Sequence, residues 1–213
     1  MKHRFVFFDL DGTLTDSEVG IVNCLEYGLQ AVGAQIPDRS ELRKHIGPSL
    51  YDVFAALGVP KQLHDDAIAS YRERFTDVGI YENKLIDGVP EMLEALKLQG
   101  RTLSLATSKL ETFSQRVLEH FKIDQYFSFI SGAILDNSRL HKPEVITHAI
   151  NHFEADPNCI AMIGDRIDDL KGAHICGVDS IAVTWGFGDP TEFNHPGVIG
   201  IADHPSEIME LLK

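Results

Sequence analysis

Short apolar runs alternate with helical patterns over most of the chain. The runs are rich in β-branched and aromatic residues, which is typical of strands buried on both faces of a sheet. They cover residues 4–8, 102–106, 159–164 and 180–185, with a weaker run at 128–131. The segments between the later runs have apolar residues at helical spacing, and two of them open with a proline. Strands that alternate with helices predict βαβ units and a parallel sheet.

Residues 17–81 break this alternation, because helical patterns follow one another there without an intervening strand. Ser17 is expected to cap the first of these helices, and Asp38 with Glu41 forms a capping-box pattern for the second. This pattern therefore indicates an insertion between the first and second strands.

The combined pattern predicts an α/β fold with a Rossmann-like parallel sheet core and an inserted helical cap domain. The expected core comprises residues 1–15 and 84–213, and the expected cap comprises residues 16–83.

Composition narrows the range of partners. Hydrophobic residues make up 44% of the chain and charged residues 24%, but no apolar stretch approaches the ~20 residues of a membrane span. The net charge of −13 argues against nucleic acid or an anionic membrane as a partner, so a small molecule is expected. Three cysteines without CxxC spacing favour a reducing compartment. We expect a cytoplasmic protein that is a monomer or a weak dimer.

Polar residues follow the predicted strands, and the carboxyl ends of parallel strands meet at one edge of a sheet. Asp9 and Asp11 follow the first strand, in the segment "DLDGT". The remaining polar residues at this edge are Thr107, Ser108 and Lys109 after the second strand, Lys142 ahead of a helix, and Asp165, Asp168 and Asp169 after the fourth. Carboxylates, hydroxyls and lysines together suit a hard cation bound next to a phosphate.

The motifs "DLDGT", "ATSK", "HKPE" and "GDRIDD" stand in the order seen in the haloacid dehalogenase superfamily, which the whole chain resembles. Within that superfamily it is most similar to the phosphoglycolate-phosphatase-like branch, through "IGPSL", "GDRIDDLKGA" and "TWGFG". The resemblance implies an enzyme that hydrolyses a small phosphate ester through a phosphoaspartate.

The resemblance also implies a role for each matching residue. Asp9 would be the nucleophile and Asp11 the general acid and base, since two neighbouring carboxylates need different environments to take these roles. Thr107, Ser108 and Lys142 would bind the phosphate, and Lys142 would also act in catalysis by neutralising charge on the nucleophile Asp9. The implied cofactor is Mg²⁺, held by Asp9, the backbone carbonyl of Asp11, Asp165 and Asp169. Asp168 is interpreted as a solvated or capping residue, and Arg166 has no assigned role.

Several alternatives remain open from the sequence. Arg43 in the predicted cap is either a ligand for a substrate carboxylate, as in phosphoglycolate, or a solvated helix residue. A nucleoside monophosphate, and hence a 5'-nucleotidase, is an alternative to phosphoglycolate. A sugar-phosphate phosphomutase is a further alternative, because it would share the core motifs.

A dehalogenase is disfavoured because a departing halide needs no acid such as Asp11. The alternative from another class is a receiver-like module that signals through a phosphorylated aspartate. His148 and His152 have the i, i+4 spacing of zinc ligands, but a helix face is the preferred interpretation because the glutamate of HExxH is absent.

Overall fold

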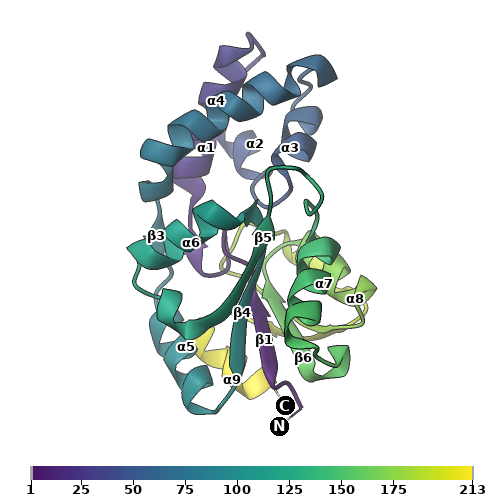
Figure 1. Ribbon diagram of the computed structural model, residues 1–213. Coiled ribbons are helices and arrows are strands. Elements are labelled where there is room, and N and C mark those ends of the chain that lie inside the picture. Colours follow the sequence, from purple (N-terminus) through teal and green to yellow (C-terminus); the bar gives the residue numbers. More distant parts are fainter. Residues whose placement is uncertain (1, 213) are drawn as a thin grey trace. The chain divides into compact units, whose positions relative to one another are not determined.

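The computed structural model describes residues 2–212, which divide into two compact units. The larger unit contains the described residues up to Asp16 and those from Leu85 onward, and the helical unit spans Ser17–Lys84. Figure 1 labels most of the helices and several of the strands.

The larger unit is built on a six-stranded parallel sheet with the order β5-β4-β1-β6-β7-β8. The chain extends the sheet from β1 through β4 to β5, and then crosses to the other side of β1 to add β6, β7 and β8. This confirms the predicted α/β fold class. The strands are β1 (Phe5–Phe8), β4 (Thr102–Leu110), β5 (Phe127–Ala133), β6 (Ile160–Gly164), β7 (Asp179–Val183) and β8 (Val198–Ala202).

Helices cover both faces of this sheet. Figure 1 shows α7 and α8 together beside β6, and α5 and α6 on the other side of β4. Their bounds, with that of the last helix, are α5 (Val89–Leu98), α6 (Glu111–His120), α7 (Lys142–Phe153), α8 (Ile167–Ile175) and α9 (Ile208–Leu211). Short 3-10 turns complete the unit: η3 (Asp124–Tyr126), η4 (Pro157–Cys159), η5 (Pro190–Phe193) and η6 (Pro205–Glu207).

The central strands are buried on both faces, as their apolar sequences predict. All five residues of β6 are buried, and so are Val6, Phe7 and Phe8 of β1. Phe7 and Met162 pack in one cluster with residues of α7 and α8. Because water is excluded there, burial of these side chains is the main favourable contribution to the stability of the unit.

The sequence did not predict every strand. β8 (Val198–Ala202) lies at the sheet edge and is only partly buried, and its short apolar run contains Gly200, a residue that is depleted in strands. Two further strands, β2 (Thr15–Asp16) and β3 (Lys84–Leu85), are two residues long and pair with each other. Strands of this length have no recognisable periodicity.

The helical unit contains α1 (Glu18–Ala31), α2 (Arg39–Arg43), α3 (Leu50–Ala56), η1 (Lys61–Leu63), α4 (His64–Asp77) and η2 (Gly79–Tyr81). Gly20 of α1 faces η2 so closely that a Cβ atom there would lie 2.2 Å from the carbonyl oxygen of Gly79. A side chain at this position would therefore push α1 away from η2.

The capping predictions for the first two helices were wrong in detail. Ser17 and Asp38 do precede α1 and α2, but neither side chain makes a capping hydrogen bond. A side-chain cap is instead found at α3, where Ser49 accepts a hydrogen bond from the Asp52 backbone N–H. Within residues 2–212, no helix is long and apolar enough to cross a membrane.

Candidate active site

The parallel register of β1 and β6 brings the ends of these two strands together. Phe8 pairs with Ile163, and the Asp9 backbone N–H donates a hydrogen bond of 2.9 Å to the Ile163 carbonyl. Asp9 and Asp165 therefore leave the sheet side by side. The direction in which strands are added reverses between β1 and β6, and such a switch point is where ligands bind in open parallel sheets.

Three buried carboxylates and one lysine meet at this point. Asp9, Asp165 and Asp169 each contribute a carboxylate oxygen, and these oxygens lie within 4.8 Å of one another. The Lys142 Nζ lies 2.8 Å from Asp9 Oδ1 and 2.7 Å from Asp169 Oδ1, and it donates a hydrogen bond to the Ala106 carbonyl. Among the residues that the structure describes, Asp9, Asp165 and Asp169 form the one group of three or more possible metal ligands. We call Asp9, Asp165 and Asp169 the acidic cluster.

Burial makes the acidic cluster electrostatically costly. It raises the pKa of Asp9 to about 6, with attraction to Lys142 acting against the rise and repulsion from Asp169 adding to it. Burial also raises the pKa of Asp165 to about 8, and repulsion from Asp169 and Asp9 adds to the effect. Burial lowers the pKa of Lys142, but attraction to Asp169 and Asp9 outweighs it, so the pKa lies above its ordinary value. The negative charge that the three carboxylates would carry therefore exceeds the single positive charge of Lys142.

Residues from two other loops fix the orientation of Asp165. The Thr13 hydroxyl donates to Asp165 Oδ1 at 3.0 Å, and the Phe187 backbone N–H donates to Oδ2 at 2.8 Å. Gly12 has φ +86°, and a Cβ atom there would lie 2.3 Å from Asp165 Oδ2. Only glycine suits this position, because both the backbone conformation and the close approach exclude a side chain. The sequence assigned no role to Phe187, and the segment "TWGFG" was the available signal for it.

Asp11 is also buried, and its partner is Lys109. The Lys109 Nζ lies 2.7 Å from Asp11 Oδ2. The sequence indicated that Lys109 stands at this edge of the sheet, but it did not indicate which carboxylate the lysine contacts. That pairing depends on how β4 leaves the sheet, which becomes visible only in the folded chain.

The residues at the end of β4 extend the site. Thr107 is buried, and a hydrogen bond from its side chain lowers the pKa of Asp9, which places the hydroxyl against that carboxylate. The same oxygen accepts a hydrogen bond of 3.3 Å from the Lys109 backbone N–H. Ser108 lies between them in the chain and is partly buried. The end of β4 therefore supplies a hydroxyl and a lysine to the edge where β1 supplies its two aspartates.

The other residues considered from the sequence have different surroundings. Arg43 belongs to the helical unit, on α2, where its Nε donates to Glu18 Oε2 at 2.9 Å. Asp168 is partly buried in the first turn of α8. The Arg166 backbone N–H donates to Asp169 Oδ2 at 3.0 Å, which helps to orient the acidic cluster.

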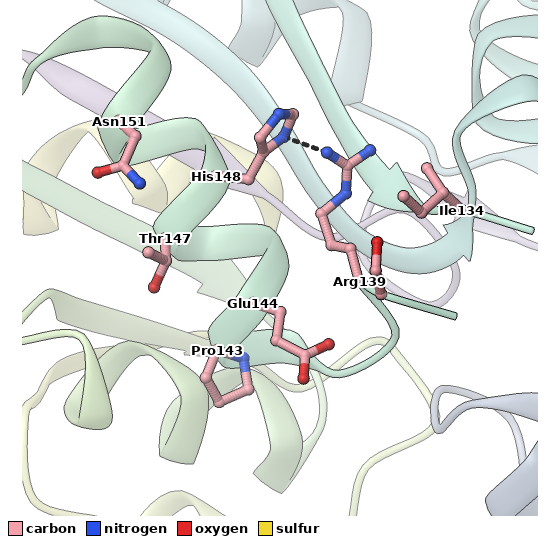
Figure 2. Close-up of a pocket in the computed structure, with 8 residues that line it drawn as sticks. Ile134, Arg139, Pro143, Glu144, Thr147, His148 and Asn151 are labelled. Carbon is pink, nitrogen blue, oxygen red and sulfur yellow. Dashed lines mark hydrogen bonds between the residues drawn. The ribbon is translucent and has the colours of Figure 1, made fainter. Parts of the chain in front are cut away.

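His148 and His152 have packing and hydrogen-bonding roles in the larger unit. They lie on α7, and His148 borders a hollow of about 480 Å³ whose lining comes from this helix and from the segment after β5. Figure 2 shows His148 beside Arg139 in this hollow. Arg139 Nη1 donates to His148 Nδ1 at 2.6 Å. The His152 ring stacks on Phe129 with 3.7 Å between the ring centres. These contacts favour the interpretation of the two histidines as a helix face.

The chemistry of the acidic cluster fits a divalent metal ion. Its possible ligands are carboxylate oxygens, which hard cations such as Mg²⁺ prefer. Three buried carboxylates face one lysine, and the raised pKa values of Asp9 and Asp165 are what an acidic site has before a cation neutralises it.

Comparisons with known proteins agree with the fold. The chain belongs to the haloacid dehalogenase-like hydrolases, a family that matches residues 6–183. A crystal structure of a predicted phosphatase from Clostridium acetobutylicum is 38% identical, superposes with a TM-score of 0.94, and covers 99% of this chain and 98% of its own.

Two relatives of similar sequence identity are named for different activities. A 5'-nucleotidase from Pseudomonas aeruginosa is 41% identical over 90% of this chain and 87% of its own length. The tyrosine-protein kinase PtkA from Mycobacterium tuberculosis is 38% identical over 98% of this chain and 71% of its own length. Phosphoglycolate phosphatases also match, for example one from Vibrio parahaemolyticus at 27% identity. The chain is therefore a haloacid dehalogenase-like phosphatase of the phosphoglycolate-phosphatase-like branch, as its motifs predicted.

Proposed function

We propose that the protein is a Mg²⁺-dependent phosphatase that hydrolyses a small phosphomonoester through a phosphoaspartate on Asp9. The observation that carries this proposal is the position of the Asp9 carboxylate, buried 2.8 Å from the Lys142 ammonium and within the acidic cluster. A carboxylate in these surroundings can accept a phosphoryl group only if nearby positive charge offsets the repulsion between two anions.

Mg²⁺ would be held by Asp9, the backbone carbonyl of Asp11 and Asp165, with Asp169 contributing directly or through a water molecule. When bound, the ion would neutralise charge on the phosphate and on the acidic cluster. Lys142 would neutralise further charge on the phosphate and on Asp9. Thr107, through its hydroxyl, and Ser108, through its backbone N–H, would bind phosphate oxygens.

The reaction has two steps. In the first, an Asp9 oxygen forms a bond to phosphorus while the bond between phosphorus and the ester oxygen breaks, and Asp11 gives a proton to that departing oxygen. In the second, Asp11 takes a proton from water, whose oxygen bonds to phosphorus as the bond between phosphorus and Asp9 breaks. Asp9 and Asp11 are regenerated, and the products are an alcohol and inorganic phosphate.

We place nucleoside 5'-monophosphates ahead of phosphoglycolate as candidate substrates. The Pseudomonas aeruginosa 5'-nucleotidase is 41% identical to this chain, compared with 27% for the Vibrio parahaemolyticus phosphoglycolate phosphatase. Arg43, the residue suggested for a substrate carboxylate, already forms an ion pair with Glu18. We further propose that the helical unit acts as a cap that supplies specificity.

The direct test is phosphate release from nucleoside 5'-monophosphates, phosphoglycolate and nitrophenyl phosphate. We expect turnover with Mg²⁺, little with the larger Ca²⁺, and none in excess chelator once residual metal is shown to be negligible. Undiminished hydrolysis in chelator would contradict the proposed site. Transfer from ATP to a tyrosine peptide, without hydrolysis of the esters, would instead indicate an activity like that named for PtkA.

Asp11→Asn tests the division of labour between the two aspartates. Alkyl phosphates should become nearly inert, because an alkoxide leaves poorly without a proton. Nitrophenolate leaves without help, so nitrophenyl phosphate should still phosphorylate Asp9, and the second step should then stall. We expect a burst of nitrophenol near one equivalent per active site, followed by a slow phase. Equal slowing of both esters without a burst would show that Asp11 is not the acid and base.

A further inference from the structure

The ion pair between Lys109 and Asp11 involves only one of the two oxygens of the Asp11 carboxylate. The Lys109 Nζ lies 2.7 Å from Asp11 Oδ2, and the two side chains are 7% and 10% exposed. Asp11 Oδ1 is buried and has no hydrogen-bond partner among the residues that the structure describes. A buried carboxylate oxygen without a donor is energetically costly, so this atom requires an explanation.

The backbone conformation around Lys109 explains how the ammonium reaches Asp11. The pairing of β4 with β5 becomes irregular between Ala106 and Leu110, so this part of β4 does not continue the regular ladder. The Lys109 backbone N–H turns to the Thr107 hydroxyl at 3.3 Å instead. A strand irregularity of this kind changes the direction of a side chain, and such features are common next to active sites.

We propose that Lys109 is a positioning residue that fixes the Asp11 carboxylate through Oδ2, so that Oδ1 is the oxygen that gives and takes the proton. This inference rests on the proposed function, because it requires Asp11 to be the acid and base. The two oxygens of a free carboxylate are chemically equivalent, and an ion pair to one of them makes them different. Displacement of a reacting group by about 1 Å can slow a reaction by roughly 10²-fold, so this fixation matters for the rate.

A direct role for Lys109 in binding the phosphate makes a different prediction. The loss of a phosphate ligand would weaken the binding of every ester, whatever its leaving group, and would raise KM. Loss of a positioning residue would instead slow the steps in which Asp11 moves a proton.

The variants to compare are Lys109→Met and Lys109→Gln, with Lys171→Met on the exposed face of α8 as a control of equal charge change. For Lys109→Met we expect kcat for alkyl phosphates to fall by roughly 10²-fold with little change in KM. The burst with nitrophenyl phosphate should persist, and its slow phase should become slower. Lys109→Gln keeps a hydrogen-bond donor and should lose less, and Lys171→Met should match the wild type.

A double-mutant cycle provides a second readout. If Lys109 acts through Asp11, then Lys109→Gln should have no further effect in the Asp11→Asn background. Independent losses in the double mutant, or a rise in KM shared by all esters, would overturn the role of Lys109 while leaving the phosphatase proposal intact. An inactive wild type with Mg²⁺ bound would overturn both.

Discussion

The two units of the protein each contain a partly or fully buried carboxylate site, and the two sites differ in how well their charges are balanced. In the helical unit, Glu82 accepts hydrogen bonds from Arg74 at 2.7 and 3.0 Å and from the Asn23 side chain at 3.0 Å. In the larger unit, Asp9 and Asp169 of the acidic cluster share Lys142, and Asp165 accepts hydrogen bonds from the neutral Thr13 hydroxyl and Phe187 backbone N–H.

The pKa values of these carboxyl groups reflect the difference in charge balance between the two sites. Hydrogen bonds from Arg74 lower the pKa of Glu82, whereas burial raises the pKa values of Asp9 and Asp165. A carboxylate whose pKa falls on folding stabilises the protein once it is ionised, and one whose pKa rises destabilises it. The comparison indicates that the Glu82 network stabilises its unit, whereas the unbalanced charge of the acidic cluster lowers the stability of the larger unit.

The largest expected effect is on catalysis. Asp9→Asn should lower kcat by about 10⁴-fold or more for every ester, because the amide cannot form the phosphoaspartate. Steady-state phosphate release and the nitrophenol burst should both disappear. Glu82→Gln is the matched carboxylate-to-amide control in the helical unit, and it should retain the burst. A residual burst in Asp9→Asn would assign the nucleophile to another residue.

The same two variants should change stability in opposite directions. In metal-free protein at neutral to mildly alkaline pH, Asp9→Asn should raise the free energy of unfolding by about 1 kcal/mol, because it removes a destabilising buried charge. Glu82→Gln should lower it by about 1–2 kcal/mol, since hydrogen bonds to a charged group are lost. Denaturant unfolding in chelator measures both. A loss of stability in Asp9→Asn would contradict the unbalanced charge of the acidic cluster.

The smallest expected effect is on the pH dependence of stability. Because the folded-state pKa of Glu82 lies below its ordinary value of 4.5, its contribution is fully present above that pH. The contribution is lost as pH falls through the folded-state pKa. The difference in unfolding free energy between wild type and Glu82→Gln should therefore be constant near neutral pH and shrink in acid. A difference that grew as the pH fell would rule out a lowered pKa.

Much of the larger unit could be predicted from residue patterns. The buried strands β1 and β6 have apolar runs that only a central strand of a parallel sheet would bury on both faces, and the fold class was correct for this reason. β8 was not predicted, because its short apolar run contains Gly200, and glycine is depleted in strands. The capping signals at Ser17 and Asp38 were misleading in detail, since a side chain with capping chemistry still needs the correct rotamer and backbone angles.

The sequence by itself determined the chemistry available to this protein. Asp9, Lys142, Asp165 and Asp169 could be named from their places after predicted strands and before helices, because the ends of parallel strands meet at one edge. Only the tertiary structure decided which charges pair at that edge. The register of β1 with β6, the irregular end of β4 and the 2.7 Å contact between Lys109 and Asp11 depend on packing between segments that are far apart in the sequence, which local residue patterns do not encode.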